Sequence, residues 1–196
     1  EITMKPFSQA AENNKGPILD VLRDYLTAPG DLLEIGAGTG QHAVWLAPHF
    51  PQVLWTPTEL PENLDGLSQW LADAPSDNLA EPLALDVEGD WPAQAYRYIF
   101  TANTFHIVSR PQVELCIRRV CETLLPDGRF LVYGPFNYHG TYTSDSNREF
   151  DLSLKARDIA MGIRDQEWVV ERFAEHGREL IHDHAMPANN RILVFG

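Results

Sequence analysis

The feature that most constrains this chain is a glycine-rich turn that directly follows an apolar run. Leu32, Leu33 and Ile35 lead into the segment Gly36-Ala37-Gly38-Thr39-Gly40, and a helical pattern starts at Gln41. Glycine lets the backbone turn sharply and lets a ligand approach it closely, because no Cβ stands in the way. A strand that turns directly into a helix also presents free backbone N–H groups at the helix N-terminus. The segment therefore predicts a nucleotide-type cofactor site at the carboxyl end of the first strand of a doubly wound sheet.

The spacing of these glycines distinguishes between cofactors. A dinucleotide fingerprint has glycine at its first, third and sixth positions, whereas here the sixth position is Gln41 and the third glycine comes one residue early, at Gly40. Glu34 lies two residues before the first glycine, and its negative charge would repel a pyrophosphate and attract a cation. S-adenosylmethionine (SAM) carries a sulfonium and an ammonium and has no phosphate. The pattern acid-x-Gly-x-Gly-x-Gly resembles the first motif of the class I SAM-dependent methyltransferases.

Strand and helix patterns alternate along most of the chain. Strands are expected over 31–35, 53–59, 82–87, 98–103 and 129–134, and helices over 18–26, 40–48, 62–74, 111–124, 147–161 and 166–176. Two final strands, 178–184 and 191–195, are joined by a short segment that contains Pro187 and Asn190. Such alternation is typical of a parallel sheet covered on both faces by helices. We therefore predict an α/β, doubly wound Rossmann-like fold with a seven-stranded, mostly parallel sheet and a C-terminal antiparallel hairpin.

Composition limits the class of partner. The formal net charge of -13 disfavours nonspecific binding to nucleic acid or anionic lipid, because both require neutralisation of phosphates. No apolar run approaches the roughly 20 residues of a membrane span, and no signal-peptide pattern opens the chain. We expect a cytoplasmic protein with a small-molecule acceptor, no nucleic-acid or membrane partner and no bound metal. Cys116 and Cys121 suit neither a disulfide framework nor a zinc site and are interpreted as reduced thiols.

We predict one domain over residues 1–196, with two departures from the regular alternation. Residues 1–15 lack a long periodic pattern and are interpreted as an N-terminal arm over the cofactor, in which Asn13 or Lys15 donates to the cofactor carboxylate. The alternative is a helix lead-in that is capped by Asn14. Residues 135–164 begin with a loop rich in Tyr, Ser, Thr and Asn, continue into the helix expected over 147–161, and are interpreted as an insertion on the acceptor side.

Polar residues follow the predicted strands where a cofactor would lie. Glu59 ends the second strand, at the separation from the glycine turn where doubly wound folds place an acid on the ribose hydroxyls. The resemblance implies that Asp86 accepts from the adenine amino group, that the backbone of Val87 meets a ring nitrogen, and that Asn103 faces the methionine part. The predicted cofactor-binding residues are Glu34, Gly36, Gly38, Gly40, Glu59, Asp86, Val87, Asn103, Asn13 and Lys15.

The acceptor side is predicted from the loops that follow the fourth and fifth strands. A general base is needed only if the nucleophile arrives protonated, and His139 and His106 are the candidates, each with a loop-shaping role as its alternative. The predicted substrate-binding residues are Phe136, Tyr138, Tyr142, Asn147, Asp151, Arg157 and Asn189. Aromatic, amide and guanidinium groups favour a small polar acceptor whose carboxylate Arg157 would bind. The alternative is that Asp151, Lys155 and Arg157 form ion pairs on a helix surface.

Several longer segments resemble one group of methyltransferases over essentially the whole chain. They are residues 8–15, 133–136, 147–151 with Leu154 and Arg157, 162–165 and 186–190. The group is the methyltransferase-like 26 group, an uncharacterised set of presumed SAM-dependent methyltransferases. We therefore predict a SAM-dependent methyltransferase that acts on a small polar molecule. Two alternatives stay open: a noncatalytic SAM-fold binding protein and an NAD-type oxidoreductase.

Overall fold

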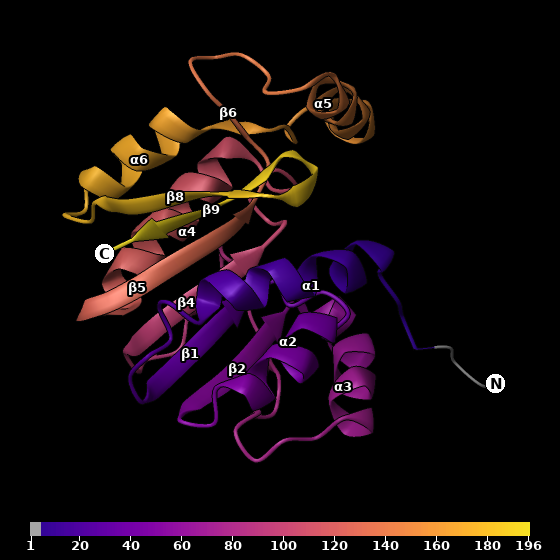
Figure 1. Cartoon of the computed structure of the whole chain (residues 1–196), viewed down its shortest axis with the longest axis vertical. Coiled ribbons are helices and arrows are strands. Elements are labelled where there is room, and N and C mark those ends of the chain that lie inside the picture. Colours follow the sequence, from indigo (N-terminus) through magenta and orange to yellow (C-terminus); the bar gives the residue numbers. More distant parts are fainter. Residues whose placement is uncertain (1–4) are drawn as a thin grey trace.

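A single twisted sheet forms the centre of the protein in a computed structural model that describes residues 5–196 (Figure 1). Its strands are β1 (Gly30–Ile35), β2 (Val53–Glu59), β3 (Leu83–Ala84), β4 (Tyr96–Ala102), β5 (Leu124–Gly134), β8 (Leu180–Met186) and β9 (Asn190–Phe195). Their order is β3-β2-β1-β4-β5-β9-β8. The first five run parallel, and β9 is antiparallel to both β5 and β8. The predicted fold class is thus confirmed, including the C-terminal hairpin.

Helices cover both faces of the sheet because successive side chains of a strand point to opposite faces. The helices are α1 (Gln9–Leu22), α2 (Gln41–Leu46), α3 (Leu64–Asp73), α4 (Arg110–Thr123), α5 (Asp145–Arg157) and α6 (Gln166–Ala174). On one face, α1 and α2 pack against Leu32 and Phe100. On the other face, α4 and α6 pack against Leu33 and Ile99. The two cores together bury nearly every apolar residue of the central strands.

The N-terminal segment differs from its prediction. Residues 9–15, expected in an extended arm, belong to α1, and Ser8 caps this helix by accepting the backbone N–H of Ala11 at 3.2 Å. Pro17, expected near the helix start, lies inside the helix. Burial of Ile18 and Leu22 against the sheet outweighs the hydrogen bond that an internal proline removes. Residues 1–4 of the predicted arm lie outside the described residues.

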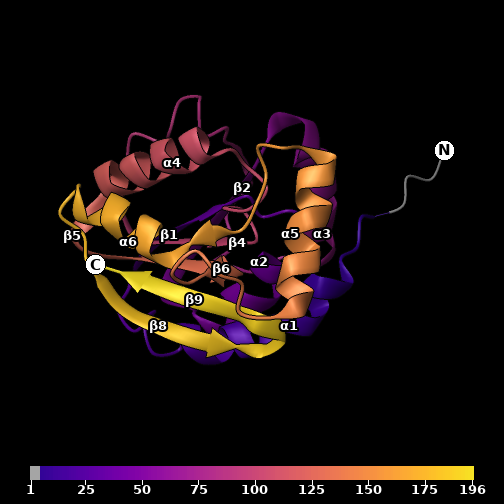
Figure 2. The same cartoon turned by 90° about the horizontal axis from the view of Figure 1, so that it is seen from above.

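The insertion on the acceptor side contains more order than the sequence indicated. Two short strands, β6 (Phe136–Asn137) and β7 (Arg164–Asp165), pair in parallel outside the main sheet. They tie both ends of the insertion together, and α5 lies between them in sequence. The Asn147 amide of α5 donates to the backbone oxygen of Asn189 at 3.2 Å. The insertion is thereby fastened to the β8–β9 connection, close to α1 in the view of Figure 2.

Two further findings concern the predicted partners and thiols. Within residues 5–196, no helix is both long enough and apolar enough to cross a membrane. Cys116 and Cys121 are free thiols on α4.

Candidate active site

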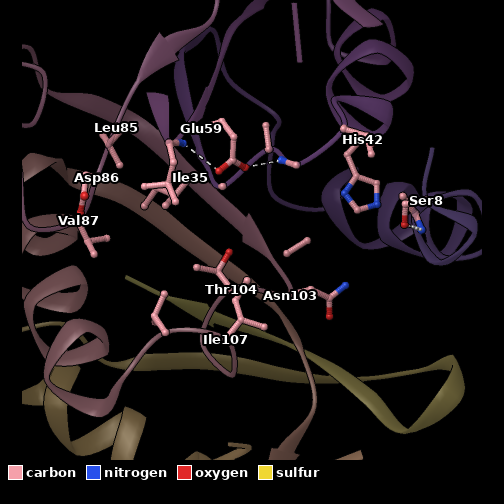
Figure 3. Close-up of a pocket in the computed structure, with 18 of the residues that line it drawn as sticks. Ser8, Ile35, His42, Glu59, Leu85, Asp86, Val87, Asn103, Thr104 and Ile107 are labelled. Carbon is pink, nitrogen blue, oxygen red and sulfur yellow. Dashed lines mark hydrogen bonds between the residues drawn. The ribbon is translucent and has the colours of Figure 1, made fainter. Parts of the chain in front are cut away.

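A cavity of about 410 Å³ opens at the carboxyl ends of β1, β2 and β4 (Figure 3). It lies where the strand order reverses, because the chain goes outward from β1 to β2 and β3 and then returns to β4 beside β1. Ligands of doubly wound sheets bind at such a switch point, and small-molecule sites typically measure about 300–1,000 Å³. Of the predicted cofactor-binding residues, this cavity is lined by Gly36, Gly38, Glu59, Asp86, Val87 and Asn103.

The three glycines of the turn have different tasks. All three have positive φ, at 64°, 60° and 95° for Gly36, Gly38 and Gly40, a region that glycine enters without steric cost. A Cβ on Gly36 would lie 3.0 Å from the Thr104 hydroxyl, and one on Gly40 would lie 2.7 Å from Leu67. A Cβ on Gly38 would meet no atom within 4 Å. Gly38 therefore keeps space open for a ligand, whereas Gly40 begins α2 against α3 and does not line the cavity, in contrast to its prediction.

The Glu59 carboxylate organises the turn as well as facing the cavity. Its oxygens accept the backbone N–H of Gly38 at 2.7 Å and of Leu60 at 2.9 Å (Figure 3). Each carboxylate oxygen can accept more than one hydrogen bond, so capacity for ligand hydroxyls is left. Asp86 forms a turn by accepting the N–H of Glu88 at 3.0 Å. Cavity walls made by two acids at neighbouring strand ends fit a ligand that offers hydroxyl and amino donors.

Glu34 does not line this cavity, in contrast to its predicted contact with the cofactor. The side chain is 1% exposed and accepts the indole N–H of Trp55 at 3.0 Å. Strand alternation turns Leu32 and Glu34 toward α1 and α2, whereas Ile35 faces the opposite core. Burial, with a smaller contribution from the charge of Glu59, raises the pKa of Glu34 to about 7. The carboxyl is thus a buried acid beneath the glycine turn rather than a wall of the cavity.

Replacing Glu34 with glutamine is expected to change how stability depends on pH. In the unfolded chain Glu34 ionises near a pKa of about 4.3, whereas the folded protein keeps it protonated up to about pH 7. The stabilisation from the protonated form is therefore present below pH 4.3 and is lost as the pH rises through 7. Urea unfolding of the ligand-free protein at pH 8 should find Glu34→Gln more stable than wild type by about 3 kcal/mol. Equal pH dependence of the two proteins would contradict the buried acid.

Other residues of this cavity escaped the sequence analysis. They are Ser8, Ala11, Ile35, Ala37, Thr39, His42, Leu60, Leu85, Ala102, Thr104, Ile107, Val108 and Gln112. His42 is the most polar of them; its imidazole is hydrogen-bonded to the Asn14 amide oxygen at 2.6 Å, and burial lowers its pKa to about 4. The available signal was its place in the first turn of the helix after the glycines. Ser8 had no signal, because the sequence does not show that α1 begins beside this turn.

The N-terminal segment is fastened to the turn by Gln41. Its side chain accepts the backbone N–H of Ser8 at 2.6 Å and donates to the backbone oxygen of Ser8 at 3.1 Å. Lys15 points elsewhere: it pairs with Glu12 at 2.7 Å and lies over the Trp45 ring. The position of the Lys15 side chain therefore does not support its predicted donation to the cofactor.

A second cavity, of about 680 Å³, adjoins the first. The two share Ser8, Asn103 and Ile107 in their linings. The second is also lined by His106, and by Asn147 and Asn189 of the predicted substrate-binding set. Asn13, predicted to bind the cofactor, lines this second cavity instead. Two ligands, one in each cavity, would approach each other at the shared wall beside Asn103.

His106 is a neutral, buried imidazole on the wall of the second cavity. Burial, and then the nearby Arg164 charge, lower its pKa to about 4. Its ring packs edge-on against Phe150, with centroids 5.4 Å apart. The Arg164 guanidinium holds the loop of His106 in place by donating to the backbone oxygens of Phe105 at 3.0 Å, of Val108, and of Ala160 at 2.9 Å.

Replacing Arg164 with methionine is expected to destabilise the fold strongly. The substitution leaves three backbone oxygens without a donor, and each hydrogen bond to a charged group contributes about 1.5–3 kcal/mol. We expect the free energy of unfolding to fall by about 3 kcal/mol or more, measured by urea denaturation. Arg148→Met is the matched control, because Arg148 is exposed and pairs only with Asp145, three residues away. Similar losses in both variants would contradict the role of Arg164.

The other predicted acceptor residues lie outside both cavities. His139, a predicted base, is exposed and its backbone N–H donates to Glu167 at 3.0 Å. Phe136 is buried in the core beneath α4 and α6. The Tyr138 hydroxyl donates to Asp183 at 2.6 Å. Neither Tyr138 nor His139, which lie in the turn that begins after β6, lines either cavity, so their predicted contact with substrate has no support from the geometry.

Asp151, also predicted to bind substrate, is committed to structure. It is 1% exposed and accepts from Tyr142, from Lys155 at 2.8 Å and from the backbone N–H of Ile163 at 2.8 Å. These contacts hold α5 to the return segment and also occupy Tyr142. Arg157 is exposed at the last residue of α5. The alternative of ion pairing on the helix is thus correct for Asp151 and Lys155.

No three His, Cys, Asp or Glu side chains gather into a metal-binding group anywhere in residues 5–196. His182 and His184 do lie together, with ring centroids 4.1 Å apart. The Tyr25 hydroxyl is hydrogen-bonded to the His184 ring at 2.6 Å, and this contact joins β8 to the turn that follows α1.

Similar folds occur among solved methyltransferase structures. Human N-acetylserotonin methyltransferase in complex with SAM matches with a TM-score of 0.82 and 15% identity, over 95% of this chain and 52% of its own. An O-methyltransferase family 2 protein of Planctomyces limnophilus in complex with apigenin matches with a TM-score of 0.82 and 19% identity, over 95% of this chain and 58% of its own. An O-methyltransferase family protein of Burkholderia thailandensis matches with a TM-score of 0.81 and 12% identity, over 95% of this chain and 57% of its own. The chain spans somewhat over half the length of these proteins.

Strand order, hairpin and cavity together define the fold class: this is the fold of the class I SAM-dependent methyltransferases. Within that class, residues 5–196 match the family described as "Protein of unknown function (DUF938)". The chain belongs to this family.

Proposed function

We propose that this protein is a SAM-dependent methyltransferase that acts on a small polar molecule. The observation that carries the proposal is the pair of adjoining cavities, which share Asn103 at the carboxyl edge of the sheet. The first is bounded by the glycine turn, Glu59 and Asp86, and the second contains a buried imidazole. Two cavities that share a wall suit a donor and an acceptor that must be held in line.

The first cavity fits SAM by the chemistry of its lining. We assign the backbone around Gly38 and the Glu59 carboxylate to the ribose side, Asp86 and the Val87 N–H to the adenine, and Asn103 to the methionine part. Among the described residues, the lining contains two carboxylates and neither lysine nor arginine. A pyrophosphate would find no counter-charge there, whereas a cation is attracted. The selectivity that the sequence suggested for Glu34 is thus assigned to Glu59 and Asp86.

Bound SAM supplies an electrophilic methyl group on a sulfonium. The task of the chain is to orient the acceptor and to receive its proton if the nucleophile is a hydroxyl. We assign proton acceptance to His106, because its imidazole is neutral above about pH 4 and lines the second cavity.

The fuller assignment follows the longer segments of the sequence. We propose that the chain is a single cytoplasmic domain related to the methyltransferase-like 26 group. Asn13, Asn147 and Asn189 line the second cavity, and they fall within three of the segments that carry this resemblance.

Calorimetric titration with SAM, S-adenosylhomocysteine (SAH) and NAD⁺ tests the cofactor. We expect SAM and SAH to bind and NAD⁺ not to bind. Binding of NAD⁺ without SAM would favour the oxidoreductase alternative. Incubation with metabolite extracts and methyl-labelled SAM then tests transfer, and the expected result is a labelled small molecule. Binding of SAM with no labelled product across such extracts would favour the noncatalytic alternative.

A further inference from the structure

The second cavity is lined to an unusual extent by one type of side chain. Six asparagines face it: Asn13, Asn14, Asn103, Asn147, Asn189 and Asn190. They come from α1, from the loop after β4, from α5, and from the β8–β9 connection with the first residue of β9. Four segments that are far apart in sequence therefore bring the same amide group to one place. We propose that this cavity takes an acceptor that has no net charge and bears hydroxyl or amide groups, which the asparagine amides bind. This proposal rests on the proposed function.

The amides have hydrogen-bonding capacity of both kinds to offer. An asparagine side chain has two N–H donors and a carbonyl that accepts twice. Asn147 uses its N–H groups on Thr143 and on the Asn189 backbone oxygen, at 3.1 and 3.2 Å, which leaves its carbonyl oxygen to accept. Asn13 accepts from Gln9 at 2.8 Å, which leaves its N–H groups to donate. The wall thus matches a ligand that both donates and accepts, as hydroxyl and amide groups do.

Charge is missing from the same wall. Among residues 5–196, the lining includes no lysine, arginine, aspartate or glutamate. Cations on the surrounding elements are paired: Lys15 with Glu12 at 2.7 Å, Arg148 with Asp145 at 2.9 Å and Arg191 with Asp183 at 2.7 Å. The lining offers an anionic acceptor no basic side chain to offset the hydration that it would lose here, which is costly. A cationic acceptor would be repelled by the sulfonium of the donor next door.

Arg157, the predicted partner for an acceptor carboxylate, is too far away to serve. Phe150 is the last residue of α5 that lines the cavity. Arg157 lies seven residues farther along this helix, or about 10 Å along its axis at 1.5 Å per residue. The Phe150 ring and three proline rings (Pro17, Pro135 and Pro187) supply apolar surface to the cavity. An uncharged molecule that combines a ring with hydroxyl groups therefore satisfies the lining best.

Backbone strain in the lining supports a built site rather than a gap between loops. In the described chain, four residues other than glycine have positive φ, and three of them, Asn103, Ala188 and Asn189, line this cavity. Their φ values are 58°, 60° and 59°. Asparagine enters this region readily, whereas alanine pays about 1–2 kcal/mol, so Ala188 is the strained residue of the three. Strain of this kind persists where the surrounding structure imposes it and clusters at ligand sites.

A matched pair of probes tests the proposal: catechol and 3,4-dihydroxybenzoate, which differ only by a carboxylate. Each is titrated into the SAH complex of the ¹⁵N-labelled protein, and the side-chain amide signals of the six asparagines are followed by NMR. We expect catechol to shift these signals and to bind at least 10-fold more tightly than the acid. Equal or tighter binding of the acid, or no shift with catechol, would overturn the proposal. Formation of the SAH complex is measured separately, so its failure identifies a failure of the proposed function instead.

A charge insertion separates the local effect from the overall negative charge of the protein. Asn13→Lys introduces a cation at an exposed position of α1 that lines the cavity, and we expect it to tighten binding of 3,4-dihydroxybenzoate at least 10-fold. Gln52→Lys is the control. Gln52 is exposed beside the amino end of β2, so this substitution adds the same charge away from the cavity. An equal effect of both substitutions would contradict the assignment of acceptor charge to this cavity.

Discussion

Replacing Gly38 with arginine is expected to abolish SAM binding, with a loss of affinity of more than about 10³-fold. A side chain at residue 38 meets no protein atom within 4 Å of its Cβ and therefore grows into the cavity. There it fills the space assigned to the ribose and brings a cation toward a cationic ligand. Calorimetry with SAM and SAH measures the loss, and circular dichroism checks that the variant is folded.

Gly177→Arg is the matched control for backbone strain. Gly177 also has positive φ, at 76°, and a Cβ there also meets nothing within 4 Å. Both substitutions carry the same left-handed penalty of about 1–2 kcal/mol, but Gly177 lies between α6 and β8, away from the cavity. We expect Gly177→Arg to bind SAM as the wild type does. A folded Gly38→Arg protein with wild-type affinity would remove the cofactor assignment.

Replacing His106 with asparagine is expected to reduce turnover of a hydroxyl acceptor by about 10³-fold, the range for loss of a general base. Affinity for SAH should stay within about twofold, because His106 lines only the second cavity. Turnover is measured by transfer of labelled methyl to the acceptor identified in the extract screen. His139→Asn is the control: that side chain is 89% exposed, and its loss should leave turnover unchanged.

The pH profile of the wild type provides a second readout of His106. Its pKa is lowered to about 4, and the neutral form that accepts a proton is therefore fully present at neutral pH. Protonation of His106 should not lower turnover until the pH falls toward 4, whereas an exposed histidine would protonate near pH 6.5. A drop in turnover centred near pH 6.5 that disappears in His106→Asn would contradict the burial of this imidazole.

The cofactor cavity could be predicted well from the sequence because its parts are local features of the chain. Gly36 and Gly38 mark a turn by backbone conformation alone, and the ends of parallel strands meet at one edge of the sheet. Glu59 ends β2, Asp86 lies two residues past β3, and Asn103 directly follows β4, so the strand order brings all three to one cavity. The alternation of strand and helix, which hydrophobic periodicity reveals, predicts the parallel sheet, whereas the order of its strands comes from the structure.

The direction of individual side chains was decided by packing. Glu34 precedes the glycine turn in the motif, yet strand alternation and the indole of Trp55 draw it into the core. Lys15 lies on α1, whose first residues line the cavities, yet its side chain pairs with Glu12. His139 follows β6 in a polar loop, yet it faces Glu167 on the surface. Residue type and spacing do not determine which of two faces a side chain takes, since neighbours from other elements decide it.

The sequence by itself determined the fold class and the cofactor end of the site, because these depend on backbone turns and strand ends. Only the tertiary structure decided the acceptor end. Asn147 and Asn189 were predicted to bind substrate, and Asn13 and Asn103 to bind the cofactor, but the sequence did not show that the four share one cavity. They become one uncharged wall because α1, the loop after β4, α5 and the final hairpin converge on the same edge of the sheet. Convergence of segments more than 40 residues apart is a property of long-range packing, and no local pattern encodes it.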